Sequence, residues 1–273
     1  MRIYNVCQTA DYYLDYLERT VDDPLLFDHH CHSLYEMTIL LEGDISIVVE
    51  GQKFHLEKNQ AIIIPPLLYH KNIANQLTMY RRITSLFDIS AVPLVLRDSL
   101  PIMENEYSLT VFDVYSIQAS KLRQCCIDNN PGYYEPLINS LMVECLYQHA
   151  FSKSQAQERT IGNKVLYSII QYVEQHLNDN ISLDDVVSHT GQSKSSICGL
   201  FKSEMGISIK QYIISKKLAK ANWLMQNGIS STQAALQIGY ENYSSFYRIY
   251  RKFYNSSPSD HNIEKPIDVD DTK

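Results

Sequence analysis

The amino-acid sequence predicts an α+β multidomain protein, in which an N-terminal β-barrel with a helical hairpin precedes an all-α domain with two helix-turn-helix units. Three observations predict this arrangement. Strand-like runs separated by turn residues occupy residues 35–95. From about residue 115 the apolar residues recur every three or four positions instead. An internal repeat with a glycine turn then extends over residues 183–257. The length of 273 residues suits two domains of ordinary size.

The strand-like part begins with four short runs, several of them rich in Ile and Val: YEMTILLEG, DISIVVEG, QKFHLEK and NQAIIIPP. Gly43, Gly51 and Asn59 begin the turns between these runs, at a spacing of eight residues. Short strands with regularly spaced turns are typical of a β-barrel or a β-sandwich. We expect further strands at residues 81–89 and 109–114.

The helical part begins with two segments of helical periodicity, residues 114–127 and 135–151, which an Asn-Asn-Pro-Gly turn separates. This pattern predicts a helical hairpin. Residues 151–160 lose the periodicity, and Ile161 begins a helix with apolar residues at every fourth position up to Leu177. We therefore expect a barrel over residues 1–114, a hairpin over 115–151, a linker over 152–160, a helical domain over 161–262 and a disordered acidic tail over 263–273.

Charge is unevenly distributed along the chain, whose formal net charge is −7. Residues 1–163 carry 12 Lys or Arg against 20 Asp or Glu, whereas residues 164–262 carry 10 against 7. The positive surplus in the C-terminal part fits an acidic partner for that part. The N-terminus has no long apolar run, and no stretch approaches the roughly 20 apolar residues that cross a bilayer. We expect a cytoplasmic protein that has no membrane partner.

The six cysteines form no CxxC pair and have no zinc-finger spacing. We expect reduced, buried thiols, and a redox-sensing role of the adjacent Cys125 and Cys126 stays open. The sequence contains neither GxGxxG nor GxxxxGK, and no nucleophile with a base can be assigned. We therefore predict no cofactor and no catalysis.

The internal repeat pairs LDDVVSHTGQSKSSICGLFKSEMGIS with STQAALQIGYENYSSFYRIYRKFYNSS. Val187 and Gly191 of the first unit correspond to Ala235 and Gly239 of the second, at an offset of 48 residues. A glycine four residues after a small residue permits the positive φ of a turn between two closely crossing helices. A plain helical bundle would also contain such a turn, but two tandem units with basic helix ends favour DNA binding.

Residues 161–262 resemble the DNA-binding domain of the AraC/XylS family of transcription regulators. The second unit carries the resemblance most fully, through Gly239, Tyr240, Phe246, Arg248, Tyr250 and Pro258. The resemblance implies that both recognition helices enter successive major-groove segments of double-stranded DNA, about 34 Å apart on one face. Residues expected to contact bases or phosphates are Lys194, Ser195, Cys198, Lys202, Tyr243, Ser244, Tyr247, Arg248, Arg251 and Lys252.

The first unit departs from the family pattern. Gly199 occupies the position of Arg248, where the family usually has arginine, and a glycine within a helix costs about 1 kcal/mol relative to alanine. Val187 and Asn255 replace the usual alanine and glycine. We therefore expect the second unit to provide most of the base specificity. The small positive surplus argues against a nonspecific nucleic-acid-binding protein.

The N-terminal half contains His30, His32 and Glu36, with His70 at the end of IPPLLYH. This set resembles the metal ligands of cupin barrels. The same segment resembles the sensing domain of AraC-type regulators, in which such patterns imply neither metal nor turnover. We favour a cupin-like pocket whose four polar side chains hydrogen-bond a small ligand, and we predict no metal. A metal-dependent sensor, a cupin-type metalloenzyme tethered to a DNA-binding module, and a purely structural role remain alternatives.

The hairpin is the expected dimerisation element by resemblance, and the alternative is a cap over the open end of the barrel. The expected partners are therefore DNA, a second copy of the chain, a small-molecule effector and, if the protein is an activator, RNA polymerase. The sequence identifies neither the effector nor the operator.

Overall fold

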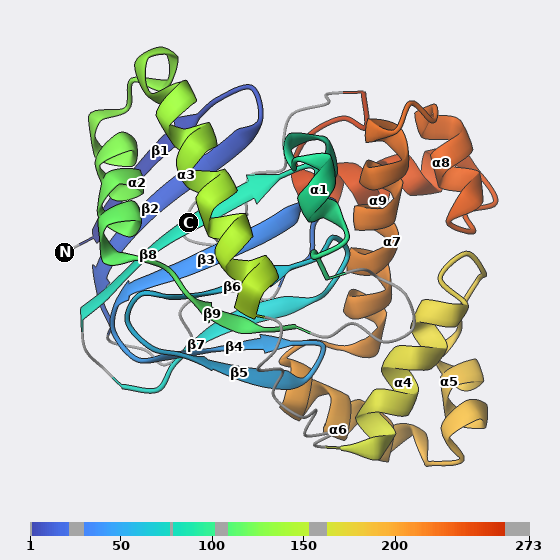
Figure 1. Cartoon of the computed structure of the whole chain (residues 1–273). Helices are drawn as coiled ribbons and strands as arrows, with labels where there is room; N and C mark the ends of the chain where they lie inside the picture. Colours follow the sequence, from blue (N-terminus) through green and yellow to red (C-terminus); the bar gives the residue numbers. More distant parts are fainter. Residues whose placement is uncertain (1, 22–29, 77–78, 102–108, 153–162, 260–273) are drawn as a thin grey trace.

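The computed structural model describes residues 2–21, 30–76, 79–101, 109–152 and 163–259 (Figure 1). Within these ranges the strands belong to the N-terminal half and the longer helices follow from residue 116 onward. The coarse fold class expected from the sequence is thus confirmed. The predicted tail and residues 153–160 of the predicted linker lie outside the described residues, and Ser152 is the last residue of a helix.

The strands form two antiparallel sheets. The larger sheet has the order β1 (Arg2–Gln8), β2 (Tyr12–Thr20), β8 (Met79–Phe87), β3 (Tyr35–Glu42), β6 (Gln60–Ile64) and β9 (Val111–Asp113). The smaller sheet has the order β5 (Gln52–Leu56), β4 (Ile45–Val49) and β7 (His70–Ala74). No ladder joins the two sheets within the described ranges. The strands therefore form an open two-sheet arrangement within the described ranges, and the β-barrel expected from the sequence is not confirmed.

The larger sheet is covered on both faces. Ile62 and Ile64 of β6 belong to an apolar cluster between the two sheets, whereas Ala61 and Ile63 belong to a second cluster beneath the helical hairpin. Successive side chains of a strand point to opposite faces. Burial of both faces therefore accounts for the uninterrupted apolar run at residues 61–64.

The predicted hairpin consists of α2 (Ser116–Asp128) and α3 (Pro131–Ser152), which meet at Asn129, where φ is +45°. Both helices lie across the outer face of the larger sheet (Figure 1). Two short elements, η1 (Ile89–Ala91) and α1 (Leu94–Arg97), precede the hairpin.

The described residues 163–259 contain six helices: α4 (Lys164–Gln175), α5 (Leu183–Thr190), α6 (Lys194–Met205), α7 (Ile209–Gln226), α8 (Ser231–Gln237) and α9 (Tyr243–Tyr254). Helices α5 and α6 form the first predicted unit, α8 and α9 form the second, and α7 connects them. The first unit shares its apolar core with α4 and with Cys31, Leu67 and Tyr69 of the N-terminal half. Among the described helices, none has both the length and the hydrophobicity needed to span a bilayer.

Candidate nucleic-acid interface and histidine cluster

The two glycine turns have the backbone conformation that the repeat predicts. Gly191 ends α5 at φ +64°, and Gly239 follows α8 at φ +80°. A Cβ atom at Gly239 would lie 2.6 Å from the carbonyl oxygen of Asn178 and 2.9 Å from that of Asp179. Glycine at this turn is therefore required both by the backbone angle and by the close approach of the 178–179 loop.

Helix α6 presents polar side chains on the face opposite its core. Its N-cap is Ser193, whose side chain accepts a hydrogen bond from the backbone N–H of Ser196. The inward face consists of Ile197, Phe201 and Met205, which are buried. Of the predicted contact residues on α6, Lys194, Ser195 and Lys202 are exposed and Cys198 is half-buried.

Helix α9 has the same two-sided construction and a stronger basic stripe. Phe246 and Tyr250 are buried beneath it. Because residues four apart share one face of a helix, the predicted contact residues form one stripe. Ser244, Arg248, Arg251 and Lys252 are exposed, and Tyr243 and Tyr247 are half-buried.

Arg248 is held only loosely within α9. Its Nε lies 3.4 Å from the carbonyl oxygen of Ser244, and its Nη2 lies 3.4 Å from the Oγ of Ser245. These distances exceed the usual range of 2.7–3.2 Å for N–H···O hydrogen bonds. The guanidinium is therefore available to a new acceptor at little cost.

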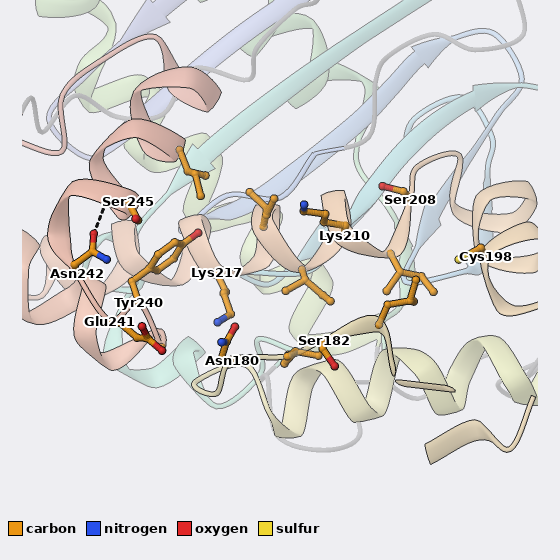
Figure 2. Close-up of a pocket in the computed structure, with 17 residues that line it drawn as sticks. Asn180, Ser182, Cys198, Ser208, Lys210, Lys217, Tyr240, Glu241, Asn242 and Ser245 are labelled. Atoms are coloured by element: carbon orange, nitrogen blue, oxygen red, sulfur yellow. Dashed lines mark hydrogen bonds between the residues drawn. The ribbon is translucent and has the colours of Figure 1, made fainter. Parts of the chain in front are cut away.

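An open groove of about 600 Å³ separates the two units (Figure 2). Cys198 of α6 lines one end, and Ser245 of α9 lines the other. Lys217 of α7 also lines it, but its Nζ donates to the carbonyl oxygens of Asp179 (2.6 Å) and Ile238 (2.7 Å). This lysine therefore ties the 178–179 loop to the end of α8 and is not directed at a phosphate.

Lys216, the neighbouring residue, is fully buried at the contact between the two halves of the chain. Its Nζ donates to Oε1 of Glu50 at 2.9 Å, and it is also bonded to Glu174 and to the carbonyl oxygen of Leu67. Burial alone would lower the pKa of Lys216, but the charges of Glu174 and Glu50 outweigh it and raise the pKa. Lys216 and Lys217 both count toward the positive surplus of the C-terminal part, yet neither faces outward.

Glu50 is the matching acceptor from the N-terminal half, in the turn between β4 and β5. Tyr212 donates its hydroxyl to Oε2 of Glu50 at 2.7 Å, and the backbone N–H of Tyr69 donates to Oε1 at 2.8 Å. Sequence reasoning did not identify Glu50, Tyr212 or Lys216. Glu50 is 162 positions from Tyr212 and 166 positions from Lys216 in the sequence, and no local pattern links these residues.

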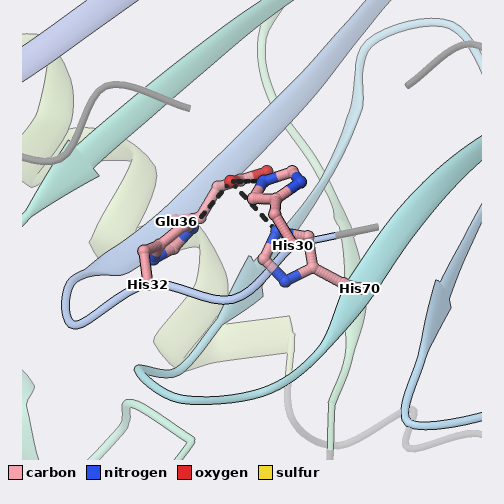
Figure 3. Close-up of side chains that lie close together, drawn as sticks. All are labelled: His30, His32, Glu36 and His70. Atoms are coloured by element: carbon pink, nitrogen blue, oxygen red, sulfur yellow. Dashed lines mark hydrogen bonds and ion pairs between the residues drawn. The ribbon is translucent and has the colours of Figure 1, made fainter. Parts of the chain in front are cut away.

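The structure brings His30, His32, Glu36 and His70 together at one end of the space between the sheets (Figure 3). The Oε2 atom of Glu36 lies 3.0 Å from Nε2 of His32, 3.2 Å from Nε2 of His70 and 3.7 Å from Nε2 of His30. His32, Glu36 and His70 are buried, whereas the side chain of His30 is 25% exposed. A backbone bridge between His30 and His70 fixes these two residues beside each other.

Glu36 is ionised in this environment. Burial raises the pKa of its carboxyl group, but the charge of His70 and hydrogen bonds with the three histidines hold that pKa well below its usual range. Its second oxygen, Oε1, accepts a hydrogen bond of 2.9 Å from the hydroxyl of Thr38. Thr38 was not among the predicted site residues.

The adjacent Cys125 and Cys126 lie in an environment that disfavours the thiolate. Cys125 and Cys126 are both buried under the hairpin. Burial raises the pKa of the Cys125 thiol to about 11 and raises that of Cys126 further. Because the thiolate is the reactive form, these values argue against redox sensing. Among the six cysteines, only Cys198 is not buried.

Comparisons with known proteins agree with this reading of the C-terminal helices. Residues 186–262 match a family model described as a helix-turn-helix domain. The probable transcriptional regulator LumQ of Photobacterium leiognathi is 32% identical over 118 residues, which are 43% of this chain and 47% of that protein. The xylose operon regulatory protein of Escherichia coli K12 is 27% identical over 104 residues, which are 38% of this chain and 26% of that protein.

The chain thus spans less than half the length of these curated relatives. Among solved structures, apo ToxT from Vibrio cholerae strain SCE256 is similar to 93% of this chain and 98% of its own, at 14% identity and a TM-score of 0.43. The C-terminal part of the chain is an AraC-type helix-turn-helix domain, and the resemblance found in the sequence is confirmed.

Proposed function

We propose that the protein is a cytoplasmic, sequence-specific DNA-binding transcription regulator of the AraC/XylS type. The observation that carries the proposal is the pair of helix-turn-helix units, each with an exposed polar stripe on its second helix. Helix α7 has 18 residues, and at 1.5 Å per residue it spans about 27 Å. This separation is compatible with two recognition helices on one face of B-DNA, whose repeat is about 34 Å.

The two units have unequal roles in this proposal. In the second unit, Arg248 reads base edges together with Tyr243, Ser244 and Tyr247, and Arg251 and Lys252 contact phosphates. In the first unit, Lys194, Ser195, Cys198 and Lys202 serve mainly for positioning. Gly199 supports the distinction, because it is exposed at the middle of α6 and offers no side chain to a base.

The N-terminal half acts as a cupin-like sensing domain over residues 1–114, joined through the hairpin and a linker at 152–160 to the DNA-binding domain at 161–262. Its effector site is the cluster of His30, His32, Glu36 and His70. The buried contact of Glu50 with Lys216 and Tyr212 supports communication between the halves, since it joins the sensing sheet directly to α7. We assign no catalytic step to the cluster.

Dimerisation uses the hairpin. Exposed apolar side chains on and beside α2 and α3 support this assignment: Tyr115 is 68% exposed, Ile117 64% and Phe151 80%, and all three line one open groove. Apolar side chains gathered on one surface mark interaction sites. A dimer would bring two DNA-binding domains to paired sites and raise their effective concentration there. RNA polymerase becomes a further partner if the regulator activates transcription.

The test is selection of bound sequences from a random pool of duplex DNA, followed by titration at several salt concentrations. A regulator enriches a motif that spans two adjacent major-groove segments, and it retains a large preference over random DNA as salt rises. Failure to enrich any motif, with binding that disappears at higher salt, would instead identify a nonspecific nucleic-acid-binding protein.

A further inference from the structure

We infer that His30, His32, Glu36 and His70 bind one divalent first-row transition-metal ion, and that this ion is the effector sensed by the N-terminal half. The first part depends on the cluster alone. The second part rests on the proposed function, because it requires that the C-terminal half bind an operator.

The hydrogen bonds of two rings determine which nitrogen carries the proton. Nδ1 of His32 lies 2.9 Å from the carbonyl oxygen of Leu34, and Nδ1 of His70 lies 2.8 Å from that of Leu68. A carbonyl oxygen only accepts, so Nδ1 of both rings is the donor. Nε2 is then the ring atom left to bind a cation, and both Nε2 atoms face Oε2 of Glu36.

A divalent cation between the rings and Glu36 would accept one lone pair from each Nε2 atom and one from the carboxylate oxygen.

The separations between the donor atoms fit one ion. All four ligand atoms lie within 4.8 Å of one another. Around a tetrahedral ion with bonds of about 2.0–2.1 Å, neighbouring ligand atoms are about 3.3 Å apart. The distances from Glu36 Oε2 to the Nε2 atoms, 3.0, 3.2 and 3.7 Å, are close to that value. Three imidazoles and one carboxylate suit zinc, iron, cobalt, nickel or copper, whereas magnesium and calcium require oxygen ligands.

The residues behind the ligands already hold them in place. The carbonyl oxygens of Leu34 and Leu68 fix the orientation of two rings, and Thr38 binds the carboxylate oxygen that faces away from the histidines. Outer hydrogen bonds of this kind are characteristic of metal-binding histidines. His30, with a quarter of its side chain exposed, offers an entry route for an ion.

The segment Leu67–His70 connects the cluster with the DNA-binding half. His70 belongs to the cluster, while the carbonyl oxygen of Leu67 accepts a hydrogen bond from Lys216 and the backbone N–H of Tyr69 donates to Glu50. The ring of Tyr69 packs edge-on against Tyr212 of α7, with centroids 5.5 Å apart. A change in the position of His70 on metal binding is therefore transmitted to α7 through at most three residues.

The first experiment measures metal binding to the purified full chain after removal of metals with a chelator. Co²⁺ and Zn²⁺ are the probes, and Mg²⁺ is the comparison ion. We expect one Co²⁺ per chain, with absorption bands of a four- or five-coordinate nitrogen-rich site, displacement by Zn²⁺ and no competition by Mg²⁺. His32→Ala and His70→Ala should weaken Co²⁺ binding at least about 100-fold, since loss of an outer partner alone costs 10–100-fold.

The matched control is His55→Ala, which removes an exposed histidine of the smaller sheet and should leave Co²⁺ affinity unchanged. Wild-type protein that binds no stoichiometric Co²⁺ or Zn²⁺ would overturn the metal site without reference to any variant. Equal metal binding by wild type and His70→Ala would overturn it as well.

The second experiment compares operator affinity with and without Zn²⁺, using the motif selected from random DNA. Coupling between two sites typically changes affinity by about 5- to 150-fold, and we expect a change within that range. Lys216→Met should retain the metal and lose the metal dependence of operator binding. A loaded and a metal-free protein with the same operator affinity would refute the sensing role. If the protein selects no motif in either state, the proposed function fails, while the Co²⁺ titration still decides the metal site.

Discussion

Replacement of Lys216 by methionine tests the contact between the two halves of the protein. The substitution keeps most of the length of the side chain but removes the charge that faces Glu50 and Glu174 in a fully buried position. Removal of one partner of a buried ion pair costs about 3–5 kcal/mol, because the other charge is left without compensation. Glu50 would keep the hydroxyl of Tyr212 and the N–H of Tyr69, so we expect a loss of about 3 kcal/mol, the lower end of this range.

Urea unfolding followed by the fluorescence of Trp223 measures this loss. Trp223 is the single tryptophan and lies on α7, the helix that carries Lys216. For an m value of about 3 kcal/mol/M, a loss of about 3 kcal/mol moves the unfolding midpoint by roughly 1 M. The matched control is Lys210→Met, an exposed lysine of the same helix, which should change the free energy of unfolding by no more than about 0.5 kcal/mol.

The double variant Glu50→Gln/Lys216→Met separates the ion pair from general damage to α7. Because it removes both facing charges, its free energy of unfolding should lie well above the value expected from adding the two single losses. A Lys216→Met protein as stable as Lys210→Met would refute the reasoning. Strict additivity in the double variant would refute it equally.

Three further outcomes follow from the two helix-turn-helix units. Arg248→Ala should cost about 1–3 kcal/mol of operator-binding free energy and relax the preference at one base pair, whereas Ser195→Ala should cost less. A binding titration in which Ser195→Ala loses more affinity than Arg248→Ala would contradict the unequal roles of the two units. Gly239→Ala should destabilise the protein by about 1–3 kcal/mol through overpacking against the 178–179 loop. Gly199→Ala, where the added Cβ meets nothing within 4 Å, should stabilise the protein by up to about 1 kcal/mol. Thermal unfolding should therefore give a lower melting temperature for Gly239→Ala and a higher one for Gly199→Ala than for the wild type. Alkylation of the native protein at pH 8 should modify Cys198 first, and mass spectrometry that finds a buried thiol modified as quickly would count against the described packing.

The sequence predicted the features that local patterns specify. Four strands between residues 35 and 64, the hairpin and both glycine turns were found from turn residues and apolar periodicity. The convergence of His30, His32, Glu36 and His70 also followed from a recognisable spacing. Asn255, where the family usually has glycine, ends α9 at φ +52°, a conformation that asparagine tolerates.

The missed features depend on contacts between distant segments. Strand β2 has no alternating pattern, because β8 pairs with it, α2 covers it, and six successive residues from Tyr12 to Leu17 are buried. Strand β7 was hidden by Lys71 and Asn72, which are polar in sequence but buried in the fold. The ion pair of Glu50 with Lys216 has no signature in sequence at all, since two isolated charges 166 residues apart are indistinguishable from surface residues.

The contact at Lys216 also limits how freely the two halves can be exchanged between proteins. Gly51, beside Glu50, lies so near α4 that a Cβ atom there would be 2.7 Å from Cδ2 of Leu166. A chimera that joins this helical part to a different N-terminal half therefore inherits a buried lysine and needs a carboxylate followed by a glycine at the matching hairpin turn. A fragment that contains the helical part alone would lack the carboxylate partner of Lys216. Neutralising Lys216 is therefore the change that would make this fragment an independent module.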